Sequence, residues 1–285
     1  HFFVLSGPDF FVGPDADPAQ RNILGMISKL GVRLGQRVLR HLSEAHEVIA
    51  MLGGRFVHPV MGLPGGVAKA VTPEMQQRLI EIGESMVEFG QFSLGLWRDY
   101  VIGSQEYRDM IMGEAYLHRT HSIGLVDENR QLNFYHGNVR IVDVEGRQVA
   151  CYAPAEYAAH IAERVEPWSY VKFPYLKHFG WHGFVDGMDS GVYRSTPLSR
   201  LNVTDGLSTP LAQQAYEEFF EYMGGKPVHA TLATHWARLV EMLHCGEKVL
   251  AFARHEDLTD PHVRVIPEGV PHEGVGIVEA PRGLL

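Results

Sequence analysis

The stretch PDADPAQRNILGMISKLGVRLGQRVLRHLSEAHEVIAMLGG, residues 14–54, carries the clearest structural pattern in the sequence. Apolar residues recur there at steps of three and four, which is the spacing of one face of an α-helix. This apolar stripe consists of Ile23, Ile27, Leu30, Leu34, Val38, Leu42, Ala45 and Ile49. Asp17 suits the N-cap, Pro18 suits the first turn, and the pair Gly53 and Gly54 is a stop signal. The pattern predicts one long helix from Asp17 to Gly54.

Glycine and proline residues mark weak points within this helix and the boundary to the next element. Gly31 and Gly35 weaken the long helix locally or allow another helix to approach it closely. A loop rich in glycine and proline follows over 53–69. A second helix is predicted from Thr72, its expected cap, to about Tyr100.

The middle of the chain has short β-branched runs separated by turn residues, which is typical of antiparallel strands. We predict a small meander over 123–152. The other expected elements are a short helix over 154–165, an irregular segment over 168–203, helices over 211–223 and 231–255, a loop over 261–273 and a last strand over 275–278. Together these elements predict a mainly α fold with a small antiparallel β insert at about 123–152, in a single domain over 1–285.

Composition excludes several classes of protein. The chain has 285 residues, 45% of them apolar and 21% charged, which is ordinary for a globular protein with a sizeable core. Its net charge of −9 argues against nucleic acid or an anionic membrane as the main partner. No run approaches the roughly 18 apolar residues of a membrane span. The N-terminus lacks the basic region of a signal peptide. The expected location is the cytoplasm.

Histidine and cysteine are the candidate metal ligands. The pairs at suggestive spacing are His41 with Glu44, His118 with His121, and His178 with His182. None has further ligands at a supporting spacing, so surface or packing roles are favoured. The two cysteines, Cys151 and Cys245, form no CxxC motif, and we expect both to be buried and inert.

Arg282 lies between Pro281 and Gly283, a setting that fixes a guanidinium at the end of a strand. A buried arginine in a rigid setting is costly unless an anion meets it. A structural salt bridge is one explanation, and it is the simpler one. An anionic site in front of Arg282 is the other.

Five stretches, in order along the chain, resemble the large subunits of nickel–iron hydrogenases of the cytoplasmic, multimeric group. These stretches are HFFVLSGPDF at 1–10, GGRFVHPVMGLPGGV at 53–67, GVYRSTPLSRLNVTDGLSTPLAQ at 191–213, PVHATLATHWARLVEML at 227–243 and GIVEAPRG at 276–283. The resemblance covers nearly the whole chain. It implies the large-subunit fold and the reversible oxidation of dihydrogen.

The resemblance also implies roles for five residues. Arg282 reaches over the bimetallic centre without binding it. Ala280 and Pro281 line the pocket that holds the iron-bound cyanides, and His58 and Pro59 belong to the His-Pro loop of the same pocket. The implied cofactor is a nickel–iron centre with CN and CO ligands.

The sequence departs from the family at the metal ligands. In the family, two CxxC motifs supply four thiolates to nickel, and both motifs are absent here. We therefore expect a central fragment, truncated at both ends, with its cysteine ligands outside the chain. Alone, it is expected to bind no metal, to be inactive and to expose apolar surface. Expected partners are the small subunit with its iron–sulfur clusters and further diaphorase or electron-acceptor subunits, without nucleic acid or membrane.

Two other interpretations stay open on the sequence. The first is a metal-free, hydrogenase-like scaffold or electron-transfer subunit related to the quinone module of complex I. The second is a plain helical interaction domain. Cysteine pairs in the native gene on both sides of this segment would distinguish the hydrogenase from either alternative.

Overall fold

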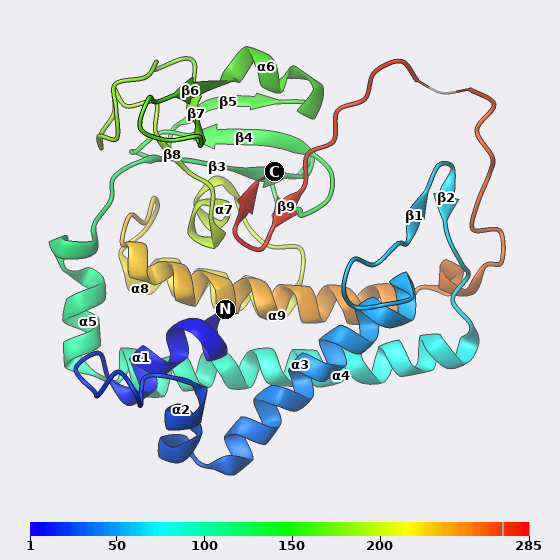
Figure 1. The fold of residues 1–285 in the computed structure, drawn as a ribbon, viewed down its shortest axis with the longest axis horizontal. Helices are drawn as coiled ribbons and strands as arrows, with labels where there is room; N and C mark the ends of the chain where they lie inside the picture. The colour runs from blue at the N-terminus through cyan, green and yellow to red at the C-terminus, as the bar shows by residue number, and fades with distance from the viewer. Residues whose placement is uncertain (270, 285) are drawn as a thin grey trace. The chain divides into compact units, whose positions relative to one another are not determined.

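The computed structural model describes residues 1–269 and 271–284 (Figure 1). Its packing separates into two compact units, which are described one at a time. The first unit comprises His1–Ser104 and Met242–Pro271, and the second comprises Gln105–Glu241 and His272–Leu285. The boundary passes through α9 (Thr234–Ala253), so this helix contributes to both. The single domain that the sequence predicts over 1–285 stays a prediction.

Glycines and capping residues set the helices of the first unit. Its elements are η1 (Phe2–Ser6), α1 (Gly7–Val12), α2 (Ile23–Leu30), α3 (Val32–Gly53), β1 (Gly62–Leu63), β2 (Gly66–Val67), α4 (Pro73–Leu96), η2 (Trp97–Ile102), the last part of α9 and η6 (Glu256–Thr259). The single long helix predicted from Asp17 was wrong. Gly31, with φ +94°, separates α2 from α3, and Asn22 caps α2. Gly54 ends α3 in the left-handed conformation, which confirms the stop signal predicted at Gly53 and Gly54.

The predicted second helix is confirmed as α4, and Thr72 caps it by accepting the N–H of Met75. Two glycines bring α4 close to α9 within the first unit. A Cβ atom at Gly83 would lie 2.9 Å from Leu250 Cα, and one at Gly90 would lie 2.9 Å from Leu243 Cα. A larger residue at either position would push the helices apart.

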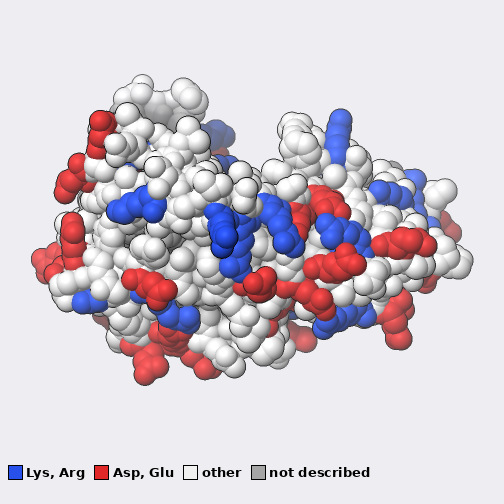
Figure 2. Space-filling view, turned by 90° about the horizontal axis from the view of Figure 1, so that it is seen from below, with Lys and Arg blue, Asp and Glu red and all other residues white. Residues whose placement is uncertain are grey.

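Charged side chains line the exposed side of α3 and α4. Arg78 forms a two-pronged ion pair with Glu47, and Arg37 pairs with Glu88 at 2.7 Å. Figure 2 shows acidic and basic side chains interspersed over the face that it presents. Such exposed pairs contribute little to stability, because water and salt screen them.

The second unit is built on a four-stranded sheet in the order β5-β4-β3-β8. Its elements are α5 (Gln105–Met112), η3 (Glu114–Tyr116), β3 (His121–Val126), β4 (Asn138–Val142), β5 (Gln148–Tyr152), η4 (Pro154–Glu156), α6 (Tyr157–His160), β6 (Ile161–Val165), β7 (Lys172–Leu176), β8 (Tyr193–Arg194), α7 (Pro197–Val203), α8 (Pro210–Met223), η5 (Thr231–Ala233), the first part of α9, β9 (Glu279–Ala280) and β10 (Gly283–Leu284). Strands β3, β4 and β5 are antiparallel, which confirms the predicted meander, and β8 joins β3 in parallel. Buried apolar side chains, Ile123 and Leu125 among them, form the core beside this sheet.

Three local predictions for this unit were wrong. The helix expected over 154–165 ends at His160, and β6 follows, because the β-branched ends of Ile161–Val165 pair with β7. The segment expected to be irregular holds β7, β8 and α7. The last strand begins at Glu279, after the residues for which it was predicted. The helices α8 and α9 are confirmed. In the described part of the chain, no helix combines the length and apolarity needed to span a membrane.

Candidate functional site

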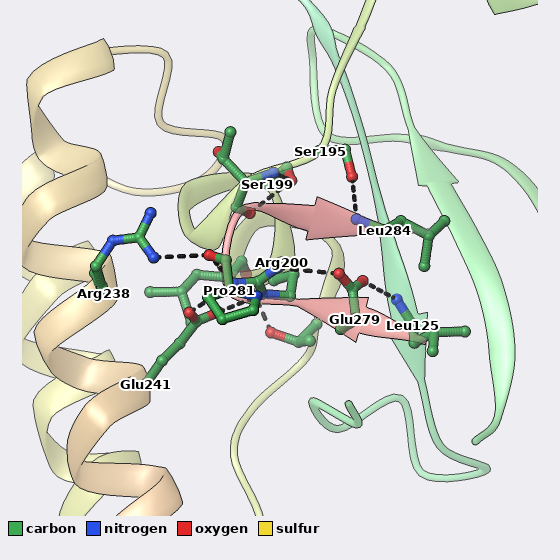
Figure 3. Close-up of polar contacts among 12 residues, drawn as sticks. Leu125, Ser195, Ser199, Arg200, Arg238, Glu241, Glu279, Pro281 and Leu284 are labelled. Carbon is green, nitrogen blue, oxygen red and sulfur yellow. Dashed lines mark hydrogen bonds and ion pairs between the residues drawn. The ribbon is translucent and has the colours of Figure 1, made fainter. Parts of the chain in front are cut away.

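A buried arginine, Arg200, organises the C-terminal end of the second unit. It lies on α7, whose residues are all buried, and only 1% of its side chain is exposed. Its Nε and Nη2 atoms donate to the two carboxylate oxygens of Glu241 at 2.6 and 2.8 Å. Its Nη1 atom donates to Glu279 at 3.0 Å (Figure 3). We call these three residues the Arg200 cluster.

The electrostatics of the Arg200 cluster follow from its burial. Burial alone would lower the pKa of Arg200, but the hydrogen bonds and charge of Glu241 outweigh it, and the pKa lies above its usual value. Burial raises the pKa of Glu279, against the opposing effects of Arg200 and the N–H of Leu125. That N–H donates to the second carboxylate oxygen of Glu279 at 2.9 Å. A buried charge group of this kind is tolerated when its partners are complete.

The cluster also holds the C-terminal hairpin, in which β9 pairs with β10. The guanidinium of Arg200 donates to the carbonyls of Ala280 at 3.0 Å and Pro281 at 3.3 Å. Arg238 of α9 donates to the same Pro281 carbonyl at 2.7 Å. Ser195 accepts the N–H of Leu284 at 2.6 Å on the other strand (Figure 3). Hydrogen bonds on both strands therefore fix the turn between them.

Gly283 is required where the hairpin meets the loop before α7. A Cβ atom at this position would lie 2.0 Å from the backbone oxygen of Ser195, closer than any real contact. Only glycine allows the two backbones to approach so closely. The turn that precedes Gly283 carries Arg282.

Arg282 is exposed. Among the residues that the structure describes, it has no carboxylate within ion-pair distance, so the structural salt bridge that the sequence favoured is made by Arg200 and not by Arg282. Burial lowers the pKa of Arg238, and the charges of Arg200 and Arg282 lower it further, against the carboxylate of Glu241. Arg282 and Arg238 thus bring positive charge to the hairpin turn, and Arg282 is the exposed one of the two.

The other two candidate residues, His58 and Pro59, belong to the first unit and are described within it. Both are exposed. His58 has φ +51°, which is uncommon for a residue other than glycine, and its carbonyl accepts the Nε–H of Arg55 at 2.9 Å. A Cβ atom at Gly53 would lie 2.3 Å from Pro59 Cβ, so the loop packs tightly on the end of α3.

The candidate metal ligands do not form a metal site within the described residues. Cys151 on β5 and Cys245 on α9 are both exposed, which corrects the expectation that they are buried. His41 is buried against Phe89 and paired with Glu44 at 3.0 Å, in agreement with a packing role. In the described ranges, no three His, Cys, Asp or Glu side chains are placed to share a metal ion. The residues present therefore do not fit a centre that needs several thiolates.

Sequence reasoning did not single out the residues that hold the hairpin. Arg200 and Glu241 each stand among apolar neighbours, in TPLSRLNV and RLVEML. A charged residue within an otherwise buried helix signals a partnered internal charge, because an isolated one would be very costly. The sequence alone does not identify the partner.

Comparison with known proteins shows what this chain is similar to. The iron-sulfur subunit of the F420-non-reducing hydrogenase of Archaeoglobus profundus is 41% identical over 283 residues, which cover 99% of this chain and 58% of that protein. The β subunit of the NAD-reducing hydrogenase HoxS of Cupriavidus necator is 36% identical over 292 residues, covering all of this chain and 57% of that protein. No protein-family model matches the chain.

The structural match agrees. The crystal structure of an NAD+-reducing [NiFe]-hydrogenase in the H2-reduced state superposes with a TM-score of 0.89 at 32% identity, over all of this chain and 60% of that one. The fold is thus that of an enzyme class built around a nickel–iron centre. Over its whole length the chain is similar to subunits of nickel–iron hydrogenases. It spans less than two thirds of the length of either relative described above.

Proposed function

We propose that this chain forms the central part of the large subunit of a nickel–iron hydrogenase, which oxidises dihydrogen reversibly to two protons and two electrons. The observation that carries the proposal is the superposition over the whole chain on an NAD+-reducing [NiFe]-hydrogenase. The named relatives are hydrogenase subunits, so they do not favour a metal-free scaffold. The proposed fold is mainly α and is completed by segments outside this sequence.

The proposed cofactor is a nickel–iron centre with CN and CO ligands. Because Cys151 and Cys245 do not fit its ligand set, we assign the ligands to cysteines outside the chain, and no metal to the chain itself. The proposed partners are an iron–sulfur small subunit, which receives the electrons, and a diaphorase or other electron-acceptor subunit. The proposed location is the cytoplasm.

The proposed role of this chain at the reaction site lies in the C-terminal hairpin. Arg282 is exposed, its charge acts on Arg238, and the backbone on either side of it is fixed by Arg200 and Ser195. A cation held in this way stabilises negative charge without having to reorganise. In this proposal Ala280, Pro281, His58 and Pro59 surround the same pocket.

The test is H2-dependent viologen reduction by the full-length protein in complex with its partner subunits. Arg282→Lys keeps the charge but loses the planar guanidinium, and we expect a loss of about 100-fold in kcat, which is typical for the loss of one preorganised donor. Arg254→Lys is the matched control, because Arg254 is an exposed arginine of the first unit paired with Glu84. It should leave kcat unchanged.

Two results contradict the proposal separately. An assembled enzyme with full nickel content and no H2 uptake would rule out the proposed activity. Full activity in Arg282→Lys would leave the activity in place and remove Arg282 from the site. Nickel content, measured on each variant, excludes loss of the centre as the cause.

A further inference from the structure

The hairpin of β6 and β7 in the second unit has one face in the core and one face outside it. Leu176 is 1% exposed and belongs to the core cluster beside the four-stranded sheet, and Ile161 packs against the same cluster. Side chains alternate between the faces of a strand, so Phe173 and Tyr175 project to the opposite side. That opposite side is the aromatic face of the hairpin.

The aromatic face is ordered by contacts among its own rings and is open to solvent. The Phe173 ring centroid lies 5.5 Å from that of Trp168, 4.8 Å from Phe184 and 6.2 Å from Trp181. Yet Trp168 is 68% exposed, Phe184 is 60% exposed, and Tyr170 in the connecting turn is fully exposed. Aromatic side chains in this state are the residues most enriched in the energetic centres of protein interfaces.

The outer edge of β6 offers backbone hydrogen bonds next to this face. The N–H of Lys177 donates to the carbonyl of His160 at 2.9 Å, which fixes the phase of the antiparallel ladder. In that phase the N–H and C=O groups of Glu163 and Val165 point away from β7. Over the described residues the sheet has only these two strands, and neither of these two residues has a backbone partner on the outer side.

The outer edge of β7 differs, because two of its three outward positions, Pro174 and Leu176, have no N–H to offer a further strand. Pro174 has no N–H to offer there, and the N–H of Leu176 already donates to the carbonyl of Gly191 at 2.9 Å. Proteins commonly use proline in this way to prevent unwanted pairing at a sheet edge. The protection of β7 and the openness of β6 define one side on which a further strand can add.

The charges of the hairpin are neutralised internally. Lys172 pairs with Glu163 at 3.0 Å, and Arg164 pairs with Glu166 at 3.0 Å. A nucleic acid or an anionic lipid surface needs cations without partners. An apolar protein segment needs none, and it can dock without burying an unpaired charge. Charge complementarity therefore favours an uncharged, extended segment of protein.

We propose that the β6 edge and the aromatic face together dock an extended, apolar segment of a partner subunit, which adds to β6 as a third strand. Main-chain bonds to Glu163 and Val165 would give the register, and Trp168 and Phe184 would receive the segment's side chains. The inference rests on the proposed function for the existence of a partner subunit. It adds the surface that holds this partner.

The experiment places the photo-crosslinking residue p-benzoylphenylalanine at Val165 in the full-length subunit, expressed with its partner subunits. Tyr135 is the matched control position, because it is 79% exposed in the same unit and lies outside the hairpin. We expect irradiation of the Val165 variant to join this protein to one of its partner subunits, with the crosslinked peptide identified by mass spectrometry. The Tyr135 variant should give no such product.

A second pair of variants tests the strand addition itself. Glu163→Pro removes the outward N–H while keeping the bonds to β7, and Glu163→Ala removes only the side chain. We expect Glu163→Pro to weaken binding of the partner about tenfold, the effect of losing one or two backbone hydrogen bonds, and Glu163→Ala to have less effect. Equal binding by both variants would overturn the strand addition.

The remaining outcomes are also decisive. A crosslink from Val165 to a second copy of this chain, or only to flanking segments of the same chain, would overturn the inference. If the assembled enzyme oxidises H2 and Val165 forms no crosslink to a partner, the proposed function stands and the inference fails. If the partner subunits do not assemble with this chain and no H2 is consumed, both fail.

Discussion

Two arginines in this molecule form the same pattern of bonds in opposite surroundings. Arg200 in the second unit donates through Nε and Nη2 to both oxygens of Glu241 and through Nη1 to Glu279. Arg78 in the first unit donates through Nε and Nη2 to both oxygens of Glu47, at 2.8 Å each, and through Nη1 to Glu81 at 3.1 Å. The Arg200 side chain is 1% exposed and the Arg78 side chain is 40% exposed.

Bond geometry alone therefore does not set the contribution of an ion pair to stability. Water screens the Arg78 pairs, and it can replace them if one partner is removed. Water does not reach the Arg200 cluster, so each charge there depends on the others for its solvation. Of the two, only the buried cluster also reaches the backbone of the C-terminal hairpin, through the carbonyls of Ala280 and Pro281.

Arg200→Gln should lower the stability of the folded chain most. It leaves the carboxylates of Glu241 and Glu279 buried without a cation, and we expect the free energy of unfolding to fall by about 3–5 kcal/mol. Urea unfolding followed by tryptophan fluorescence measures this change. Arg200→Lys restores the charge without the fork and should recover part of the stability. A loss below about 1 kcal/mol for Arg200→Gln would contradict the importance of burial.

We expect pH to have an intermediate effect on the free energy of unfolding, because a histidine of the first unit is buried. Burial lowers the pKa of His244 to about 4, with a smaller contribution from Lys248. The unfolded chain binds the proton near pH 6.5, so between pH 6.5 and 4 the unfolded state takes up more protons than the folded state. The contribution of His244 to the free energy of unfolding is therefore fully present above pH 6.5. It falls by about 1.4 kcal/mol per pH unit as the pH decreases from 6.5 to 4.

The measurement is the free energy of unfolding from pH 7 to 4.5 for the native chain and for His244→Gln. The variant should show a shallower decline with falling pH, whatever its stability at pH 7. His262→Gln is the control for the loss of a histidine as such, because 92% of the His262 side chain is exposed. Parallel slopes for the native chain and His244→Gln would show that His244 does not titrate in this window.

The periodic elements of the fold could be predicted from the sequence, and the glycine-dependent details could not. Strong helical spacing located α4, α8 and α9, and turn residues located the β3 to β5 meander. Gly31 was recognised as a weakness, but whether a glycine breaks a helix or only loosens it depends on tertiary packing. The strand β6 was missed because its apolar residues also fit a short helix, and pairing with β7 decides between the two.

The candidate site, too, was predicted from the sequence only in part. The sequence located the turn around Arg282 through Pro281 and Gly283, and the structure places that turn in the hairpin of β9 and β10. The residues that fix this turn come from α7 and α9, about 80 and 40 positions earlier in the chain. Contacts over such separations follow from the fold and leave no local pattern, so the Arg200 cluster could be found only in the structure.

Loss of the exposed arginine, Arg78, should change stability least. Arg78→Gln removes three hydrogen bonds of the same geometry as those of Arg200, and we expect the free energy of unfolding to change by less than about 1 kcal/mol, because water solvates Glu47 and Glu81 in its place. The same urea titration measures it, at low and at high salt. The small effect should shrink further as salt screens the pair. A loss as large as that of Arg200→Gln would mean that the two-pronged geometry, and not burial, gives these clusters their strength.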